Sequence, residues 1–188
     1  MLPVAVIAYL IGSFPTAYVI GKYTRGIDVS RNGTGNIGAM NAYEVTGSKT
    51  IGITVVIIDM LKGLIVTFGT QYEFGITIAL AAAFFAVLGH NYSIFMKFKG
   101  GRGLATAAGA LLIVQPIAVA LYLVIYFILR AVKLKLYFSS VSGIVAAAIP
   151  IFIKFNSPPA SLTFAALLLI TVLSKHLIPL KNELRNGI

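Results

Sequence analysis

The sequence has no cysteine, only two histidines and only five acidic residues among its 188 positions. The missing cysteine excludes disulfides, thiol catalysis and thiolate metal ligands. Two histidines and few carboxylates are too few ligands for a dedicated zinc site, so we expect neither a metal nor a cofactor. Charged residues make up only 11% of the chain, which leaves too little polar surface to cover a soluble globule of this size.

Hydrophobic residues, by contrast, make up 59% of the chain. They occur in stretches of about 15 to 20 residues, the length that crosses a hydrocarbon core about 30 Å thick. The sequence therefore predicts an all-α integral membrane protein with seven transmembrane helices, in a single domain over residues 1–188. The predicted spans are 2–21, 50–70, 75–95, 104–114, 116–130, 136–155 and 161–176.

The two shortest predicted spans are separated at Gln115-Pro116. Proline lacks the N–H donor that a helix needs and restricts the residue before it, so a turn is expected there. A single kinked span over 104–130 is the alternative interpretation, and it would place Arg130 on the opposite side of the membrane.

All but two of the 15 Lys and Arg residues fall in four segments, 22–49, 97–102, 130–135 and 175–185. Cytoplasmic loops retain such residues during insertion, so all four segments are expected on the cytoplasmic side. An even number of crossings must then separate them, which places the N-terminus outside and the C-terminus in the cytoplasm. The net charge of +10 suits anionic head groups or phosphorylated substrates. Nucleic acid is not an expected partner, because no soluble face is left to bind it.

The first polar cluster is the glycine-rich stretch 32–41, NGTGNIGAMN. Closely spaced glycines let successive N–H groups converge on an anion, and Thr and Asn side chains add donors. The candidate phosphate-binding residues here are Thr34, Gly35, Asn36, Gly38 and Asn41. A tight turn packed on helix ends explains the same stretch equally well.

The second polar cluster lies between Gly89 and Thr106. Paired glycines between two cations, directly before a helix expected from Leu104, are typical of a phosphate site at a helix N-terminus. The candidate residues are Lys99, Gly100, Gly101, Arg102 and Thr106. A positive-inside signal would explain the cations but not the glycines. His90 is either a general base or an interfacial histidine bonded to a backbone carbonyl.

The third cluster, Asp59 and Lys62, lies inside an otherwise apolar span. Ionisable residues there are costly and usually have a partner in the protein interior. At a spacing of i and i+3 the two can neutralise each other, so a structural ion pair is the favoured interpretation. The alternative is that Lys62 reaches a substrate phosphate.

Together these strings resemble the bacterial acyl-phosphate-dependent glycerol-3-phosphate acyltransferase family, the PlsY family. The resemblance rests on GSFP at 12–15, GTGNIGAMN at 33–41, DMLKG at 59–63, GHNY at 89–92 and FKGGRGLAT at 98–106. It implies a multi-pass protein of the bacterial inner membrane with its active site at the cytoplasmic face. The implied reaction moves an acyl group from acyl phosphate to the sn-1 hydroxyl of glycerol 3-phosphate, giving lysophosphatidate and phosphate. We expect a monomer whose partners are these two substrates and the lipid bilayer.

Two regions depart from the family's pattern. Glu44 stands where the family carries an Arg thought to bind phosphate, and its carboxylate would repel that group. His176 is retained, but the Asn that follows it in the family is lost and Pro179 lies nearby. Both departures bear on the binding of glycerol 3-phosphate.

The implied chemistry needs no covalent enzyme intermediate, because an acyl phosphate is already activated. His90, His176 or the substrate's own phosphate could accept the hydroxyl proton, and the sequence leaves all three open. A catalytically degenerate relative, or an anion or lipid-phosphate transporter, is the alternative function. A coupled transporter would usually carry internal repeats or more intramembrane carboxylates than Asp59 alone.

Overall fold

The computed structural model describes residues 1–154 and 159–185, and within these ranges the chain forms helices and no strand. The helices are α1 (Leu2–Ser13), α2 (Thr16–Arg25), α3 (Ala39–Thr46), α4 (Lys49–Asn91), α5 (Leu104–Val114), α6 (Pro116–Ala131), α7 (Leu136–Lys154) and α8 (Pro159–Arg185), with a 3-10 turn η1 (Ile94–Met96). The all-α prediction is confirmed for the described residues. The end of the predicted span 136–155 and residues 156–158 of the link after it lie outside them.

The first predicted span consists of two helices that meet at Phe14 and Pro15. Pro15 supplies no backbone N–H to continue the ladder of α1, and α2 begins directly after it. Near this break α1 approaches the second half of α4 closely, since a Cβ added to Gly12 would overlap the Ala86 carbonyl. The break therefore occurs where two helix backbones touch.

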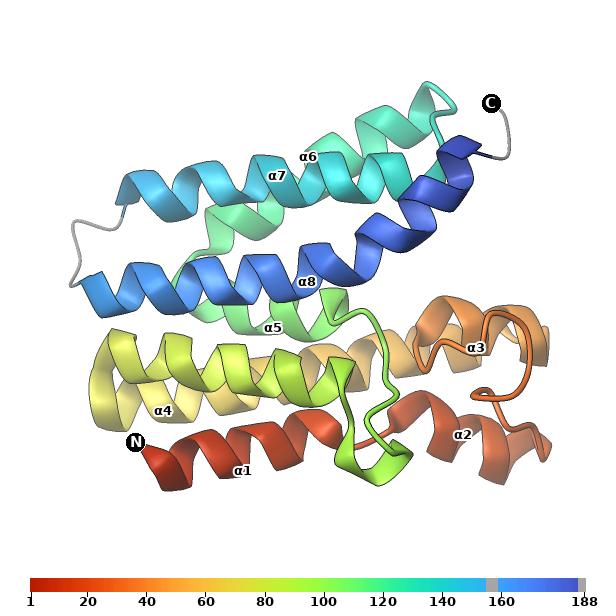
Figure 1. Ribbon diagram of the computed structural model, residues 1–188, viewed down its shortest axis with the longest axis horizontal. Helices are drawn as coiled ribbons and strands as arrows, with labels where there is room; N and C mark the ends of the chain where they lie inside the picture. The colour runs from red at the N-terminus through yellow and green to blue at the C-terminus, as the bar shows by residue number, and fades with distance from the viewer. Residues whose placement is uncertain (155–158, 186–188) are drawn as a thin grey trace.

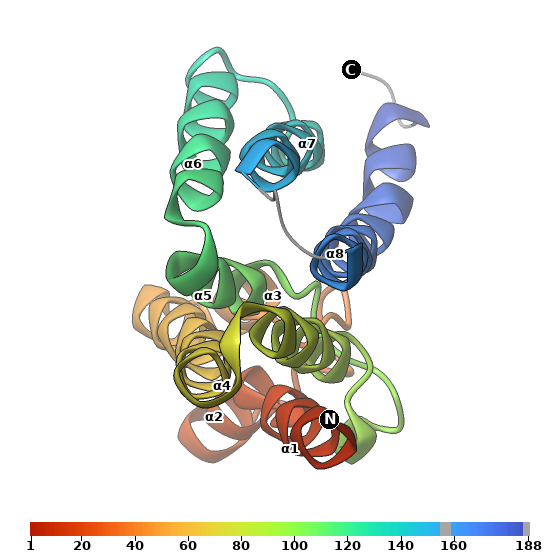
Figure 2. The same ribbon diagram turned by 90° about the vertical axis from the view of Figure 1, so that its left-hand side faces the viewer.

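α4 contains two of the predicted spans. Gly75 has φ 78° and ψ 178°, a backbone conformation that only glycine adopts without strain, and the helix folds back on itself there. The two halves of α4 lie side by side (Figures 1 and 2). The predicted link at 71–74 is helical instead, because one glycine is enough to reverse the chain.

α5 and α6 are separate helices that diverge sharply at Gln115 (Figure 2). Gln115 is buried, and its Nε2 donates a hydrogen bond of 2.8 Å to the Pro150 carbonyl in α7. This bond joins the corner to a neighbouring helix. The prediction of two short helices broken at Gln115-Pro116 is confirmed.

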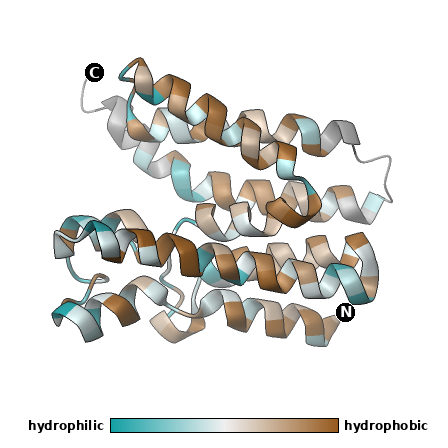
Figure 3. Ribbon diagram, turned by 180° about the vertical axis from the view of Figure 1, so that it is seen from behind, coloured by the Kyte–Doolittle hydropathy of each residue, from teal (hydrophilic) through white to brown (hydrophobic). Residues whose placement is uncertain are grey.

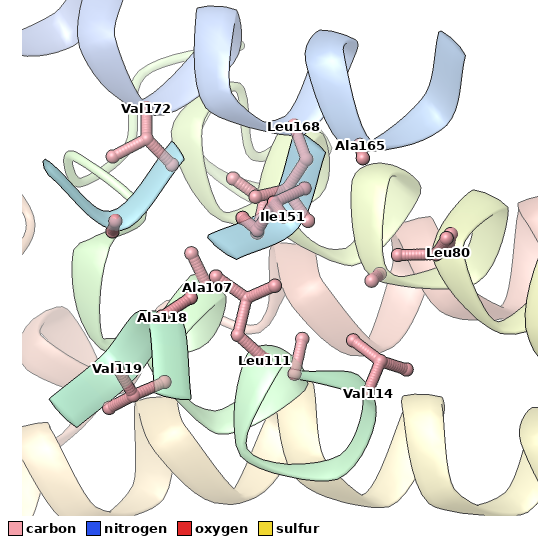
Figure 4. Close-up of a cluster of buried hydrophobic side chains, with 14 of the residues drawn as sticks. Leu80, Ala107, Leu111, Val114, Ala118, Val119, Ile151, Ala165, Leu168 and Val172 are labelled. Carbon is pink, nitrogen blue, oxygen red and sulfur yellow. The ribbon is translucent and has the colours of Figure 1, made fainter. Parts of the chain in front are cut away.

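α4 and α8 are the helices that join the others. α1 and α5 pack on α4, α6 pairs with α7, and α8 contacts both α4 and α7. The α6–α7 pair lies on the far side of α5 and α8 from α1 (Figures 1 and 2). The largest buried apolar cluster lies where α4, α5, α6, α7 and α8 meet (Figure 4).

Much of the outer surface is apolar, as a lipid-facing surface must be. Large exposed side chains such as Ile53, Ile65 and Phe127 cover it, and hydrophobic positions run along the helices (Figure 3). Two stretches, 2–25 and 49–96, are long and apolar enough to cross a membrane. The shorter apolar helices cover 104–114, 116–131, 136–151 and 162–177. Counting α1 with α2 as one segment and α4 as two gives the seven predicted segments.

Other helical parts were also not predicted. α3 lies inside the basic segment 22–49, for which no helix was predicted. α8 continues past the predicted span end at His176 and includes Pro179 in its C-terminal part, where the helix bends (Figure 1). Proline removes one backbone hydrogen bond and commonly bends a helix in this way.

Candidate active site

The glycine-rich loop before α3 is organised by the buried side chain of Asn41. Its Nδ2 donates to the carbonyls of Val29 at 2.8 Å, Asn32 at 3.1 Å and Asn36 at 3.0 Å. Its Oδ1 accepts from the Thr34 backbone N–H at 2.8 Å. The loop is therefore curled around one amide, and the amide itself is occupied by the protein.

Asp28 fixes the start of the same loop. Its carboxylate accepts from the Ser30 N–H at 2.9 Å and from the Ser30 hydroxyl at 2.6 Å, and Arg31 Nε lies 3.4 Å from it. The Ser30 hydroxyl bond is the main cause that holds the pKa of Asp28 below its ordinary value. Such a short-range turn is what an Asp two residues before Ser forms.

The two glycine-rich segments touch each other beside His90. The Gly101 N–H donates to the His90 carbonyl at 3.0 Å, and the Ile37 N–H approaches the Gly100 carbonyl at 3.5 Å. A Cβ on Gly101 would overlap His90 Nε2 and come within 2.9 Å of the Ile37 carbonyl. Glycine is required here because the two backbones and the imidazole leave no room for a side chain.

Two helix N-termini open on one cavity. α3 begins after Gly38 and α5 begins after Gly103, whose φ of 77° is again suited to glycine. The first N–H groups of a helix have no partner within it and carry its positive end, so they attract anions. The cavity wall includes Gly38, Ala39 and Met40 from one terminus and Gly103, Leu104 and Ala105 from the other.

The cavity has a volume of about 390 Å³, within the usual range for a ligand site. Its polar end is formed by Asn36, Asp59, His90, Arg102 and His176. Its other end is mostly apolar, between α4, α5, α6 and α7. That end is lined by Val56, Met60, Ala108, Val119, Tyr122, Leu123, Tyr126, Leu136 and Ser140, and Tyr137 lies where it meets Arg102 of the polar end.

A buried charged cluster joins Asp59 and His90 of the polar end to residues behind the wall. Asp59 Oδ1 accepts from Thr16 Oγ1 at 2.8 Å and from Lys62 Nζ at 2.7 Å, and His90 Nδ1 lies 3.7 Å away. Lys62 Nζ also donates to the Phe14 carbonyl at 2.5 Å. Buried charges are tolerated when paired in this way. The predicted structural pair is present, and the Lys62 ammonium is engaged away from the cavity wall.

His176 reaches the cavity from α8. Its Nδ1 lies 2.8 Å from the Val172 carbonyl, which can only accept, so Nδ1 carries the hydrogen. In the neutral ring Nε2 is then the acceptor nitrogen. α8 is fastened beside the end of α4 by Asn91, whose Nδ2 donates to the Thr171 carbonyl at 3.1 Å.

Arg102 supplies the fixed positive charge of the cavity. Its guanidinium carbon lies 4.5 Å from the centroid of the Tyr137 ring, a cation–π contact that holds the side chain against α7. Because Arg102 directly precedes the N-terminus of α5, its charge adds to that of the helix end.

The structure brings five of the predicted residues to the cavity wall: Asn36, Gly38, His90, Arg102 and His176. Five others shape the backbone behind them: Thr34, Gly35, Asn41, Gly100 and Gly101. Lys62 lies in the charged cluster, Lys99 is exposed, and Thr106 is buried. Glu44 lies on an exposed face of α3 and is not part of the wall.

The aromatic part of the cavity was not predicted from the sequence. Tyr122 and Tyr126 stack at 5.8 Å between ring centroids, and Tyr137 lies across from them on α7. Two tyrosines four residues apart in an aliphatic span share one helix face, and that spacing was the available signal.

The chain matches the family described as "Glycerol-3-phosphate acyltransferase" over residues 2–186. It belongs to that family. Among its curated relatives, glycerol-3-phosphate acyltransferase 2 of Moorella thermoacetica is 44% identical, over 81% of this chain and 78% of the relative. The glycerol-3-phosphate acyltransferase of Chlorobium limicola is 37% identical, over 83% of this chain and 70% of the relative.

Solved structures of the family agree with this fold. The crystal structure of PlsY, an integral membrane glycerol 3-phosphate acyltransferase, in its glycerol 3-phosphate form gives a TM-score of 0.89 at 29% identity. It covers 98% of this chain and 92% of that one. The lysophosphatidic acid form of PlsY gives a TM-score of 0.87. The resemblance to the PlsY family noted from the sequence is confirmed.

Proposed function

We propose that this protein transfers a fatty acyl group from acyl phosphate to the sn-1 hydroxyl of glycerol 3-phosphate, giving lysophosphatidate and inorganic phosphate. The observation that carries the proposal is the composition of one cavity. One end offers helix N-termini and a fixed cation, and the other offers only apolar and aromatic side chains apart from Ser140. A ligand with an anionic head and a long acyl chain matches both ends.

We propose that the polar end holds two phosphoryl groups. The N-terminus of α3, with Asn36 beside it, is one anion site, and the N-terminus of α5, with Arg102 beside it, is the other. Thr34 and Lys99 adjoin these two sites in the chain and are proposed to add donors when substrate is bound. Holding both anions together supplies much of the rate acceleration through positioning.

In the reaction, the sn-1 oxygen of glycerol 3-phosphate attacks the acyl carbonyl carbon, and the bond from that carbon to the phosphate oxygen breaks. Phosphate leaves with its electron pair. The charge that develops on the carbonyl oxygen is stabilised by the oriented N–H groups and by Arg102, each such donor contributing about 2.7 to 4 kcal/mol. The acyl group therefore passes directly from one substrate to the other.

We propose that His176 accepts the hydroxyl proton, because its hydrogen-bonded Nδ1 leaves Nε2 unprotonated in the neutral ring. His90, held between Asp59 and Gly101, is proposed to donate a hydrogen bond to the departing phosphate. His176→Gln should lower kcat at least tenfold with a native melting temperature, consistent with general base catalysis. Unchanged kcat in that variant would exclude His176 and assign the proton to His90 or to the substrate's own phosphate.

We further propose that the protein is a monomer of the bacterial inner membrane, with the N-terminus outside and the cavity's polar end facing the cytoplasm. The polar end is built from two of the basic segments, and such segments are retained inside. Arg31, between α2 and α3, and Tyr72, near the Gly75 reversal of α4, are exposed. The loop between α2 and α3 and the reversal of α4 lie near opposite ends of the molecule (Figure 1). In this cysteine-free chain, an impermeant thiol reagent on intact cells should label Tyr72→Cys and spare Arg31→Cys. The reverse pattern would contradict the orientation.

The direct test is phosphate release from hexadecanoyl phosphate by the purified protein in detergent, with and without glycerol 3-phosphate. We expect release that depends on glycerol 3-phosphate. A Glu44→Arg variant is the matched comparison, because Glu44 lies off the cavity wall and its reversal should change turnover little. If the native protein released no phosphate but the Glu44→Arg variant did, the native protein would be a catalytically degenerate relative that has lost its glycerol 3-phosphate site.

A further inference from the structure

A second, smaller cavity lies directly behind the apolar end of the first. Its volume is about 40 Å³, and its lining is entirely apolar. Four alanines, Ala107, Ala108, Ala118 and Ala147, contribute to it, and their short side chains leave the space open. Figure 4 shows Ala107, Ala118 and Val119 from α5 and α6 near Leu168 and Val172 from α8. An apolar cavity of this kind stays dry and accommodates apolar groups.

The two cavities share four wall residues, Leu104, Ala108, Val119 and Tyr122. These residues are the partition between them. Ala108 is too small to close it, and Tyr122 is the largest of the other three. The recess extends inward to Leu111, seven residues and so about 10 Å along α5 from Leu104.

The Tyr122 ring is held in place by its surroundings. It packs on Gly143, where an added Cβ would come within 2.8 Å of Cδ2 and 3.0 Å of Cε2. Its hydroxyl is hydrogen-bonded to Ser140, and its ring stacks on Tyr126. Because these contacts hold the ring in one orientation, it forms a rigid part of the partition between the two cavities.

We propose that Tyr122 sets the longest acyl chain that the enzyme accepts, by closing the apolar end of the cavity in front of the alanine-lined recess. This inference rests on the proposed acyltransferase function and adds its chain-length determinant. An acyl chain running from the polar end along α5 and α6 meets the Tyr122 ring. Removing the ring joins the two cavities and admits more methylene groups.

The test compares kcat/KM for hexadecanoyl and eicosanoyl phosphate in native protein and in Tyr122→Ala. We expect the eicosanoyl-to-hexadecanoyl ratio to rise about tenfold or more, the discrimination that a hydrophobic pocket exerts on misfitting methylenes. Tyr122→Phe keeps the ring and should keep the native ratio. Phe127→Ala removes an equally large ring from the lipid-exposed face of α6 and should also keep it.

A double variant checks that the recess is the space being used. Ala147→Leu in the Tyr122→Ala background refills the recess and should return the ratio toward the native value. A Tyr122→Ala ratio within twofold of native, in a variant with a cooperative melting transition, would overturn the inference.

A second readout separates this inference from the proposed reaction. The melting temperature is measured with lysophosphatidates of graded chain length, which requires binding but no turnover. Longer chains should stabilise Tyr122→Ala relative to native protein, and an unchanged chain-length profile would overturn the inference. If the native protein turned over neither acyl phosphate, but the chain-length profile of the melting temperature still shifted in Tyr122→Ala, only the proposed reaction would be contradicted.

Discussion

The two ends of the cavity are built by different means. The polar end carries its side chains on closely packed backbone: two helix N-termini and two glycine segments in contact, with a buried ion pair beside them. The apolar end is made of side chains on α4, α5, α6 and α7, next to unfilled space. In the proposed reaction, head-group chemistry therefore depends on contacts that tolerate almost no added atom, whereas the proposed chain selection depends on side chains that substitution can change.

The largest expected effect comes from breaking the buried pair behind the polar end. Lys62→Met leaves the Asp59 carboxylate buried with its cation removed, which should cost about 3 to 5 kcal/mol of stability. Thermal unfolding in detergent measures this. Lys22→Met, at an exposed position, is the control and should change stability by less than about 0.5 kcal/mol. A Lys62→Met protein of native stability but without activity would instead show that Lys62 binds substrate.

The next largest effect is expected from the fixed cation. Arg102→Ala should lower kcat/KM by about 10²- to 10³-fold, as the loss of one preorganised donor does. Arg102→Lys should recover part of this, because it keeps the charge but not the planar guanidinium. Steady-state phosphate release measures both variants. Equal activity in all three proteins would remove Arg102 from the site.

A single methyl group should disturb the contact between the glycine segments. In Gly101→Ala the new Cβ would displace His90, and a shift of about 1 Å in such a site can cost about 10²-fold in rate. Gly69→Ala is the matched control, since nothing lies within 4 Å of its Cβ. If Gly101→Ala kept native kcat, the polar end would tolerate an added methyl group, contrary to the close contacts described above.

The smallest effect is expected at Asp28, which fixes the start of the glycine-rich loop before α3. The lowered pKa of Asp28 means that its bonds to Ser30 stabilise the fold while the carboxylate is ionised. This contribution is present above its unfolded pKa, near the ordinary value of 3.8, and is lost as pH falls through the lower folded value. The melting temperature of Asp28→Asn should lie slightly below native at pH 6, and the gap should close below pH 3.8. A gap that widened in acid would contradict this account of the turn.

Features carried by local sequence were predictable. Apolar stretches gave the seven segments, Gln115-Pro116 gave the corner between α5 and α6, and the spacing of Asp59 and Lys62 gave their ion pair. Each depends on residues close together in the chain, so periodicity and composition reveal it.

Features that depend on residues far apart in the chain could not be predicted. Tyr122 becomes part of a cavity only because α6 packs against α5 and α7, and its spacing from Tyr126 marks a helix face without indicating which helices cover it. Asn41 was expected to bind phosphate, yet it is engaged by Val29, Asn32, Asn36 and Thr34. Composition identifies a hydrogen-bonding amide but does not say whether substrate or backbone will occupy it.

The central claim is that one cavity holds glycerol 3-phosphate and the acyl donor together. The most direct measurement is transfer of radiolabelled glycerol 3-phosphate into extractable lipid by the purified protein supplied with hexadecanoyl phosphate. The account predicts labelled lysophosphatidate in a one-to-one ratio with released phosphate, and its loss in Arg102→Ala. Release of phosphate without labelled lipid, from a protein that melts cooperatively, would contradict it.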